Sequence, residues 1–200
     1  MKNQGTNRTK RIVYISLLVA QALIISIVEG MLPAPFGFAP GAKLGLANLI
    51  SVIAIFTMKK REVALFISVR MVLQMLLGGT ASTFLYSLGG STLSLIFMYL
   101  AKSLGPKRVS IIGVSAVGGF FHNVGQLMVA ALLIARNLII LNYLPVLSII
   151  GILAGLFVGI GGNYLLTHVH TLTEAHLMNI EGNQSSWLPT LTGKKEKSNA

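Results

Sequence analysis

The stretch PVLSIIGILAGLFVGIGGNYLL, residues 145–166, runs for 22 residues without a charged side chain. A helix needs about 20 apolar residues to cross the roughly 30 Å of hydrocarbon in a bilayer. Pro145 suits the first turn of such a helix, where its missing N–H costs nothing. Similar apolar runs recur along the chain, so the sequence predicts an all-α, polytopic membrane protein.

Composition indicates the same class. Hydrophobic residues make up 54% of the 200 residues, charged residues make up 10%, and the mean hydropathy is +0.76. These values exclude an ordinary water-soluble domain. The net charge is +11, but the basic residues cluster at the ends of apolar runs, where they serve as topology signals and contacts to lipid headgroups. We therefore expect membrane lipids, and no nucleic acid, as partners.

The hydrophobic pattern predicts six transmembrane helices in one domain, residues 12–168, between a basic N-terminal segment, 1–11, and a tail, 169–200. The expected helices cover residues 12–28, 44–58, 63–77, 83–100, 111–135 and 145–166. The start of the chain resembles a signal peptide, but its apolar run is long and no A-x-A pattern follows, so we expect an uncleaved first helix. Residues 136–145 either extend the fifth helix, lie in the interface or form a re-entrant turn.

Charge distribution predicts the orientation of this bundle. With six spans, four basic clusters fall on one side of the membrane: Lys2, Arg8, Lys10 and Arg11; Lys59, Lys60 and Arg61; Lys102, Lys107 and Arg108; Lys194, Lys195 and Lys197. By the positive-inside rule this side is cytoplasmic, so both termini of a multi-pass cell-membrane protein face inward. The tail is polar and Trp187 is isolated in it, so we expect a flexible cytoplasmic segment.

An arginine interrupts the third apolar run, in FISVRMVLQ, residues 66–74. Arg70 lies eight residues beyond Glu62, which is roughly 12 Å along a helix and near the middle of the bilayer. A charge at this depth costs at least about 2.5 kcal/mol, so its side chain should face protein or water and not lipid. The sequence contains no aspartate, and Glu29 is the one glutamate expected on the outer side. Arg70 therefore either binds an anionic ligand or pairs with Glu29.

Polar residues on the other predicted spans support a cavity between helices. Gln74 shares a helix face with Arg70, since the two residues are four positions apart. Further polar or small residues occur at middle to outer depth: Gln21, Asn48, Ser51, Ser115, Gly119, His122, Asn123 and Gln126. These groups either line a binding site or simply hydrogen-bond one another and hold the bundle together. As substrate-binding candidates we select Lys43, Asn48, Arg70, Gln74, His122, Asn123 and Gln126.

The loop before the second span extends this candidate site. Residues 32–48, LPAPFGFAPGAKLGLAN, contain three of the six prolines of the chain and carry Lys43 where the next helix is expected to begin. An irregular path of this kind is tolerated at membrane depth where it lines a cavity. The charge of Lys43 adds to the positive end of the helix dipole. The loop is either part of an outward-facing electropositive site or an ordinary external connection.

Several motifs occur in order along the chain: PGAKLGLAN (40–48), Arg70 followed by LLGG (76–79), FHNVGQ (121–126) and YLPVL (143–147). Through this set, residues 10–168 resemble the Gx transporter family. Its members are often labelled heptaprenyl diphosphate synthase component I and resemble the substrate-binding S components of energy-coupling factor transporters. The resemblance implies a six-helix bundle that captures a small molecule and docks on an energy-coupling membrane subunit driven by ATPases. It also implies a connection to quinone, isoprenoid or flavin metabolism.

Small residues suggest where a partner subunit would dock. S components dock through small residues of the first helix, which implies this role for Ser16 and Ala20. Gly151, Gly155 and Gly159 repeat at four-residue spacing in the last span and let another backbone approach closely. That backbone belongs either to the same bundle or to another subunit, and we include the stripe among the partner-docking candidates. The glycine pairs at 78–79 and 89–90 are expected to serve close packing.

The sequence argues against a catalytic role. Chain-elongating prenyltransferases hold magnesium on aspartate-rich helices, and this chain has no aspartate and no cysteine. We therefore expect no cofactor, no metal and no catalytic residue. The leading interpretation is a substrate-capture subunit of a transporter for a small anionic or polar molecule. The alternatives are a non-catalytic membrane accessory subunit of heptaprenyl diphosphate or menaquinone synthesis or of extracellular electron transfer, and a structural scaffold.

Overall fold

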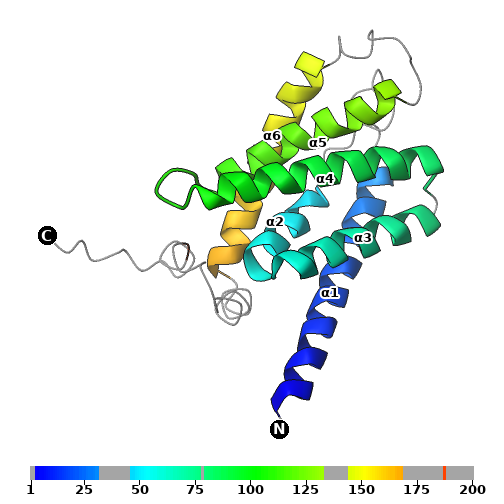
Figure 1. Ribbon diagram of the computed structural model, residues 1–200. Helices are drawn as coiled ribbons and strands as arrows, with labels where there is room; N and C mark the ends of the chain where they lie inside the picture. The colour runs from blue at the N-terminus through cyan, green and yellow to red at the C-terminus, as the bar shows by residue number, and fades with distance from the viewer. Residues whose placement is uncertain (1–2, 32–45, 78, 133–143, 169–186, 188–200) are drawn as a thin grey trace, which may run out of the picture.

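The described part of the chain is mainly helical and contains no strand. The computed structural model describes residues 3–31, 46–77, 79–132, 144–168 and 187. These residues form six α-helices: α1 (Asn3–Met31), α2 (Asn48–Thr57), α3 (Lys60–Leu76), α4 (Ala81–Ser103), α5 (Ile111–Ala130) and α6 (Leu144–His168) (Figure 1). The prediction of an all-α protein is confirmed. The start of α5 coincides with the predicted residue and that of α6 differs from it by one, whereas α1 begins nine residues before the predicted start.

Four of the helices are long and apolar enough to cross a membrane: α1, through residues Arg11–Glu29, and α4, α5 and α6. Helix α2 has ten residues and is about 15 Å long, which is half of the hydrocarbon thickness. Helix α3 has 17 residues and carries Arg61, Glu62 and Arg70. Neither helix is both long and apolar enough to cross a membrane by itself, so the crossing of the membrane by all six helices stays a prediction.

Contacts between helix ends place several basic residues at one end of the bundle. The Tyr14 hydroxyl of α1 donates a hydrogen bond of 2.9 Å to Thr57 Oγ1, at the end of α2. Lys102 Nζ, at the end of α4, donates one of 2.7 Å to the carbonyl of Ile55. The part of α1 around Tyr14, the start of α3 and the ends of α2 and α4 therefore lie together. We call this the basic end, after Arg11, Lys59, Lys60, Arg61 and Lys102.

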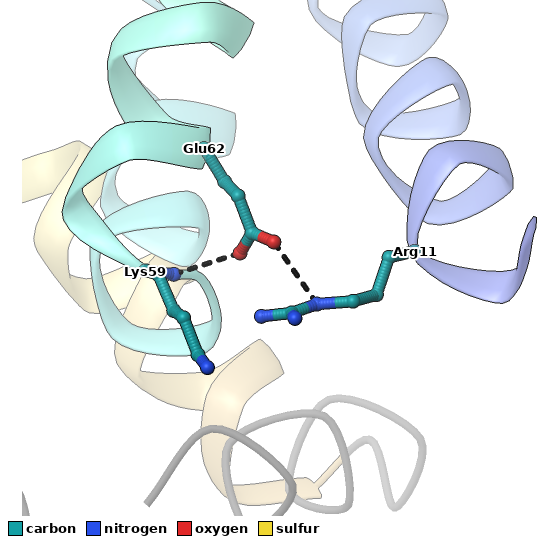
Figure 2. Close-up of polar contacts among 3 residues, drawn as sticks. All are labelled: Arg11, Lys59 and Glu62. Atoms are coloured by element: carbon teal, nitrogen blue, oxygen red, sulfur yellow. Dashed lines mark hydrogen bonds and ion pairs between the residues drawn. The ribbon is translucent and has the colours of Figure 1, made fainter. Parts of the chain in front are cut away.

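Glu62 joins two helices at the basic end. Its Oε2 accepts a hydrogen bond of 3.0 Å from the backbone N–H of Lys59, which precedes α3. Its Oε1 lies 2.9 Å from Arg11 Nε of α1 (Figure 2). A carboxylate in the first turn also interacts favourably with the helix dipole. Glu62 therefore stabilises the start of α3 and fixes it to α1, beyond which the N-terminal part of α1 projects away from the other helices (Figure 1).

Helices α4, α5 and α6 pack closely because glycines leave room for their backbones. A Cβ atom added to Gly125 of α5 would lie 2.5 Å from the carbonyl oxygen of Gly89 in α4. One added to Gly119 would lie 3.1 Å from the Cα of Gly155 in α6. No side chain fits at such distances. The expectation that the pair Gly89 and Gly90 serves close packing is confirmed, while Gly78 lies outside the described residues.

The same contacts correct the interpretation of the glycine stripe in α6. Gly151, Gly155 and Gly159 are buried, and each faces α5 of the same chain, against Gly119, Ser115 and Ile112 respectively. The stripe is therefore covered within the bundle and is not a surface for another subunit. The spacing correctly indicated a close helix contact, but spacing alone does not tell which backbone makes it.

The two ends of α4 and the start of α5 have ordinary local causes. The Thr80 hydroxyl accepts a hydrogen bond of 3.2 Å from the N–H of Thr83 at the start of α4, and Ser110 caps α5 through the N–H of Gly113 at 3.0 Å. Gly105, after the end of α4, has φ of +80°, a left-handed conformation that glycine adopts without steric cost. These residues set the entry and exit of α4.

Two residues at the basic end differ from their expected roles. Trp187 is 2% exposed and packs on Phe56 of α2, so it is not isolated, whereas the rest of the tail lies outside the described residues. Lys102 is 6% exposed, so it does not contact headgroups. Its long side chain follows α4 into the bundle, where its ammonium reaches a carbonyl group at the end of α2.

Cysteine labelling tests the membrane orientation that the basic clusters predict. In the cysteine-free chain, cysteines introduced at Ser82 and Asn137 should react with an impermeant thiol reagent added to intact cells, and one at Ser103 should not. Ser82 and Ser103 are exposed at opposite ends of α4, and Asn137 lies outside the described residues. Labelling of Ser103→Cys from outside would contradict the predicted orientation.

Candidate functional site

A cavity of about 450 Å³ lies between the helices, and residues of all six contribute to its lining. This volume is within the range of pockets for small molecules. The lining combines apolar side chains with hydroxyl, amide, imidazole and charged groups. Its polar members are Ser26, Glu29, Asn48, Ser51, Arg70, Gln74, Thr80, Thr83, Tyr86, Ser87, Ser91, Ser94, Ser115, His122, Asn123 and Gln126. So many hydrogen-bonding groups around one space are typical of a binding site for a polar molecule.

Arg70 of α3 is the cation of this cavity among the described lining residues. Its side chain is 5% exposed, and its NH1 donates hydrogen bonds to Ser51 Oγ at 3.1 Å and to the carbonyl of Ala47 at 3.3 Å. The guanidinium carbon also lies 5.9 Å from the centre of the Phe66 ring, within the range of a cation–π contact. Arg70 thus faces protein and cavity, as predicted, and α2 holds its head group.

The surroundings of Arg70 favour a negative charge. Its guanidinium lies against the first turn of α2, the positive end of that helix dipole. Arg70 Nε is buried and has no hydrogen-bond partner among the described residues. Glu29 of α1 also lines the cavity, is 6% exposed and stabilises the Arg70 cation electrostatically. The site therefore contains one buried cation and one buried carboxylate, from different helices.

Helix α5 provides the opposite wall, with different roles for its polar residues. Asn123 Nδ2 donates a hydrogen bond of 2.7 Å to the carbonyl of Leu147, so this amide fixes the first turns of α6 to α5. The His122 ring packs against Gly90 of α4, and its Nδ1 is buried without a hydrogen-bond partner among the described residues. The Asn123 amide thus helps to hold α5 and α6 together, while Nδ1 of His122 could form a hydrogen bond with a ligand.

The hydroxyl groups along α4 were not among the predicted site residues. Thr80, Thr83, Ser87, Ser91 and Ser94 all line the cavity. Their spacing of three or four residues places them on one face of the helix, over about 21 Å of its length. This spacing was a readable signal, although the neighbouring glycine pair was the feature selected from that stretch. The cavity is therefore elongated along α4, with Ser91 Oγ buried and unpartnered among the described residues.

The structure brings most of the predicted site residues together. Asn48, Arg70, Gln74, His122, Asn123 and Gln126 line the same cavity, as do Ser51, Ser115 and Gly119. Lys43 lies outside the described residues. Gln21 is exposed on α1 and does not line the cavity. Ser16 and Ala20 are exposed on α1, and a docking role for them stays a prediction. Within the described ranges, no group of three or more metal-ligating side chains occurs.

These features define a class: a helical membrane protein whose helices line a cavity that contains a buried arginine. A family model described as heptaprenyl diphosphate synthase component I matches residues 18–165. The match covers most of the chain and the lining residues of all six helices, and the protein belongs to this family. No curated protein and no solved structure matches the chain.

Proposed function

We propose that the protein captures a small polar or anionic molecule inside the membrane, as the substrate-binding subunit of a transporter. The observation that carries this proposal is the position of Arg70, a buried cation that lines a cavity of about 450 Å³. A charge in a membrane interior is costly and usually functional. An anionic ligand group at the cavity side of the guanidinium would offset that cost.

The hydrogen-bonding capacity of Arg70 supports an anionic ligand. A guanidinium has five N–H donors, and the bonds to Ser51 and Ala47 both come from NH1. Planar donors of this kind bind a carboxylate or phosphate through two parallel hydrogen bonds. The adjacent hydroxyl and amide groups would bind the uncharged part of such a molecule. The ligand of this proposal is therefore a polar molecule with an acidic group.

The transporter role would require a membrane partner. By analogy with S components, an energy-coupling subunit with ATPases would dock on the exposed face of α1 that carries Ser16 and Ala20. Small residues permit close approach of a partner helix. This part of the proposal comes from the resemblance of the sequence motifs to that group.

Membership of the heptaprenyl diphosphate synthase component I family favours a second candidate function. In this alternative the protein is a non-catalytic membrane accessory subunit of prenyl diphosphate or quinone synthesis, and its cavity holds a prenyl lipid. We propose no catalytic role in either case, because the chain lacks the aspartates that would bind magnesium on a diphosphate. Formation of a longer prenyl chain by the purified protein from isopentenyl and allylic diphosphates with magnesium would contradict this.

Native mass spectrometry of the protein in lipid nanodiscs distinguishes the two functions. Wild-type protein should retain a water-soluble acidic molecule, and Arg70→Gln should retain much less of it, because the substitution removes the charge and keeps a hydrogen-bonding side chain. Arg61→Gln is the matched control, since Arg61 is exposed at the basic end of the same helix. A bound prenyl lipid would favour the accessory subunit, and an empty cavity in wild-type protein would contradict both functions.

A further inference from the structure

Trp187 lies far along the chain from the helices that it contacts. Its Nε1 donates a hydrogen bond of 3.2 Å to the carbonyl of Lys102 in α4. Its ring lies edge-on to Phe56 of α2, with the ring centres 5.0 Å apart. With 2% of its surface exposed, Trp187 is as buried as a core residue. It therefore bridges the ends of α2 and α4 at the basic end.

Lys102 completes this cluster and connects it to the cavity. Its ammonium donates a hydrogen bond of 2.7 Å to the carbonyl of Ile55 and lies 4.7 Å from the centre of the Phe56 ring. Phe56 is thus held between Lys102 and Trp187, and all three are buried. The side chain of Ile55 lines the cavity, as does that of Met98, one turn before Lys102. The cluster therefore lies directly beyond two residues of the cavity wall.

Helix α2 links this cluster to Arg70. It is ten residues long, and Ser51 in its first half accepts the hydrogen bond from Arg70 NH1. The last turn of the same helix holds Ile55 and Phe56, which the cluster fixes to α4. A helix of about 15 Å moves largely as a rigid unit, so its two ends cannot shift independently. The position of its last turn helps to set the position of Ser51.

We infer that Trp187 is a positioning residue for the ligand site: by fixing the last turn of α2 to α4, it holds Ser51 against Arg70 at the other end of the helix. The inference rests on the proposed function, because the cavity that Trp187 would help to shape is the one in which the ligand would bind. Loss of the indole removes an aromatic contact from Phe56 and a hydrogen bond from Lys102. Water then reaches the Lys102 ammonium and weakens its bond to Ile55. Helix α2 becomes less firmly held, and the cavity opens more often.

Intrinsic fluorescence tests whether Trp187 occupies this position in a membrane. Trp187 is the one tryptophan of the chain, so the emission of the whole protein reports on it. In nanodiscs, acrylamide should quench the emission weakly, and denaturation should make the quenching strong. Strong quenching in the native protein would show a solvent-exposed indole and overturn the inference at its first step.

A cysteine in the cavity tests the coupling without any ligand. Ser91 is 5% exposed and lines the cavity, so Ser91→Cys in the cysteine-free chain should react slowly with a small methanethiosulfonate reagent. Adding Trp187→Ala should raise the rate roughly fivefold or more, because an aromatic contact and a hydrogen bond are lost and opening becomes more frequent. Trp187→Phe keeps an aromatic ring and should raise the rate less.

A control cysteine distinguishes a positioning role of Trp187 from a general loss of protein stability in Trp187→Ala. Ser82→Cys, which is exposed outside the cavity, should react equally fast with and without Trp187→Ala. An unchanged rate at Ser91→Cys would overturn the inference even if the melting temperature falls, since Trp187 would then only pack. Equal acceleration at both cysteines would also overturn it. Because neither measurement uses a ligand, a response at Ser91→Cys together with an empty cavity in mass spectrometry would contradict the proposed function and leave the coupling intact.

Discussion

Arg70→Gln is expected to leave the protein inserted and folded and to lower its affinity for the cavity ligand by about 1.5 to 3 kcal/mol, the range for a charge-assisted hydrogen bond. This corresponds to roughly tenfold to more than a hundredfold. The fold should tolerate the change because it removes a costly buried charge and keeps a hydrogen-bonding side chain. Titration of ligand-depleted protein with the copurified molecule measures the loss.

Glu29 provides the decisive comparison for this prediction. If Arg70 serves mainly to neutralise Glu29, then Arg70→Gln leaves a buried carboxylate without its counter-charge and lowers the melting temperature. In that case Arg70→Gln combined with Glu29→Gln should recover much of the stability, because the two residues are coupled. Unchanged affinity in a destabilised single variant, with rescue in the double variant, would identify Arg70 as a structural residue and contradict the proposed site.

Lys43 gives a graded version of the same test. If it contributes to the outer part of the site, Lys43→Gln should weaken binding of the same molecule less than Arg70→Gln. An ammonium near water is screened by solvent and salt, whereas Arg70 acts from a buried position. A larger loss at Lys43 would place the acidic group of the ligand nearer the outer surface than Arg70.

Much of the fold could be predicted because hydrophobic length is a strong signal in membrane proteins. The apolar part of α1, residues 11–29, closely matches the predicted 12–28. The true helix begins at Asn3 because hydropathy marks where lipid surrounds a helix and not where helical hydrogen bonding ends. The same reasoning explains α2, which is shorter than its predicted span and has eight buried residues: an apolar run predicts burial without specifying lipid or protein.

The candidate site was predictable where a residue type is costly in lipid. Arg70, His122 and Gln126 were selected because polar groups at membrane depth require polar neighbours, and all three line the cavity. Serine and threonine carry a weaker signal, since their hydroxyls can bond to the backbone of their own helix. Because of this ambiguity, the serine and threonine residues of α4 were not predicted to line the cavity.

Contacts between distant segments were beyond the reach of sequence patterns. Nothing in the sequence around Trp187 specifies that its indole packs on Phe56, because one aromatic residue has no periodicity to follow. The burial of Lys102 was not predicted either, because a lysine at the end of an apolar run is usually solvated. Its burial follows from a carbonyl of α2 within reach of its side chain, which is a property of the packed structure.

Gly119→Ala should be the most destabilising small substitution in the bundle. A Cβ at Gly119 would overlap the carbonyl oxygen of Gly151 and lie 3.1 Å from the Cα of Gly155. Both are backbone atoms, so no side-chain rotation relieves the clash and α5 and α6 must separate. We expect a loss of about 3 kcal/mol or more, at the upper end of the cost of overpacking, seen as a lower melting temperature in detergent.

Gly161→Ala in α6 is the matched control for this substitution. The nearest atom to its added Cβ would be Cδ1 of Leu49 at 3.4 Å, which belongs to a movable side chain. Alanine also favours the helix over glycine by up to about 1 kcal/mol, so the melting temperature should stay constant or rise. Because Gly119 lies one turn before His122 and Asn123 on the cavity wall, separation of α5 from α6 should also disturb the site. Equal melting temperatures for Gly119→Ala and Gly161→Ala would mean that α5 and α6 do not pack this closely in the membrane.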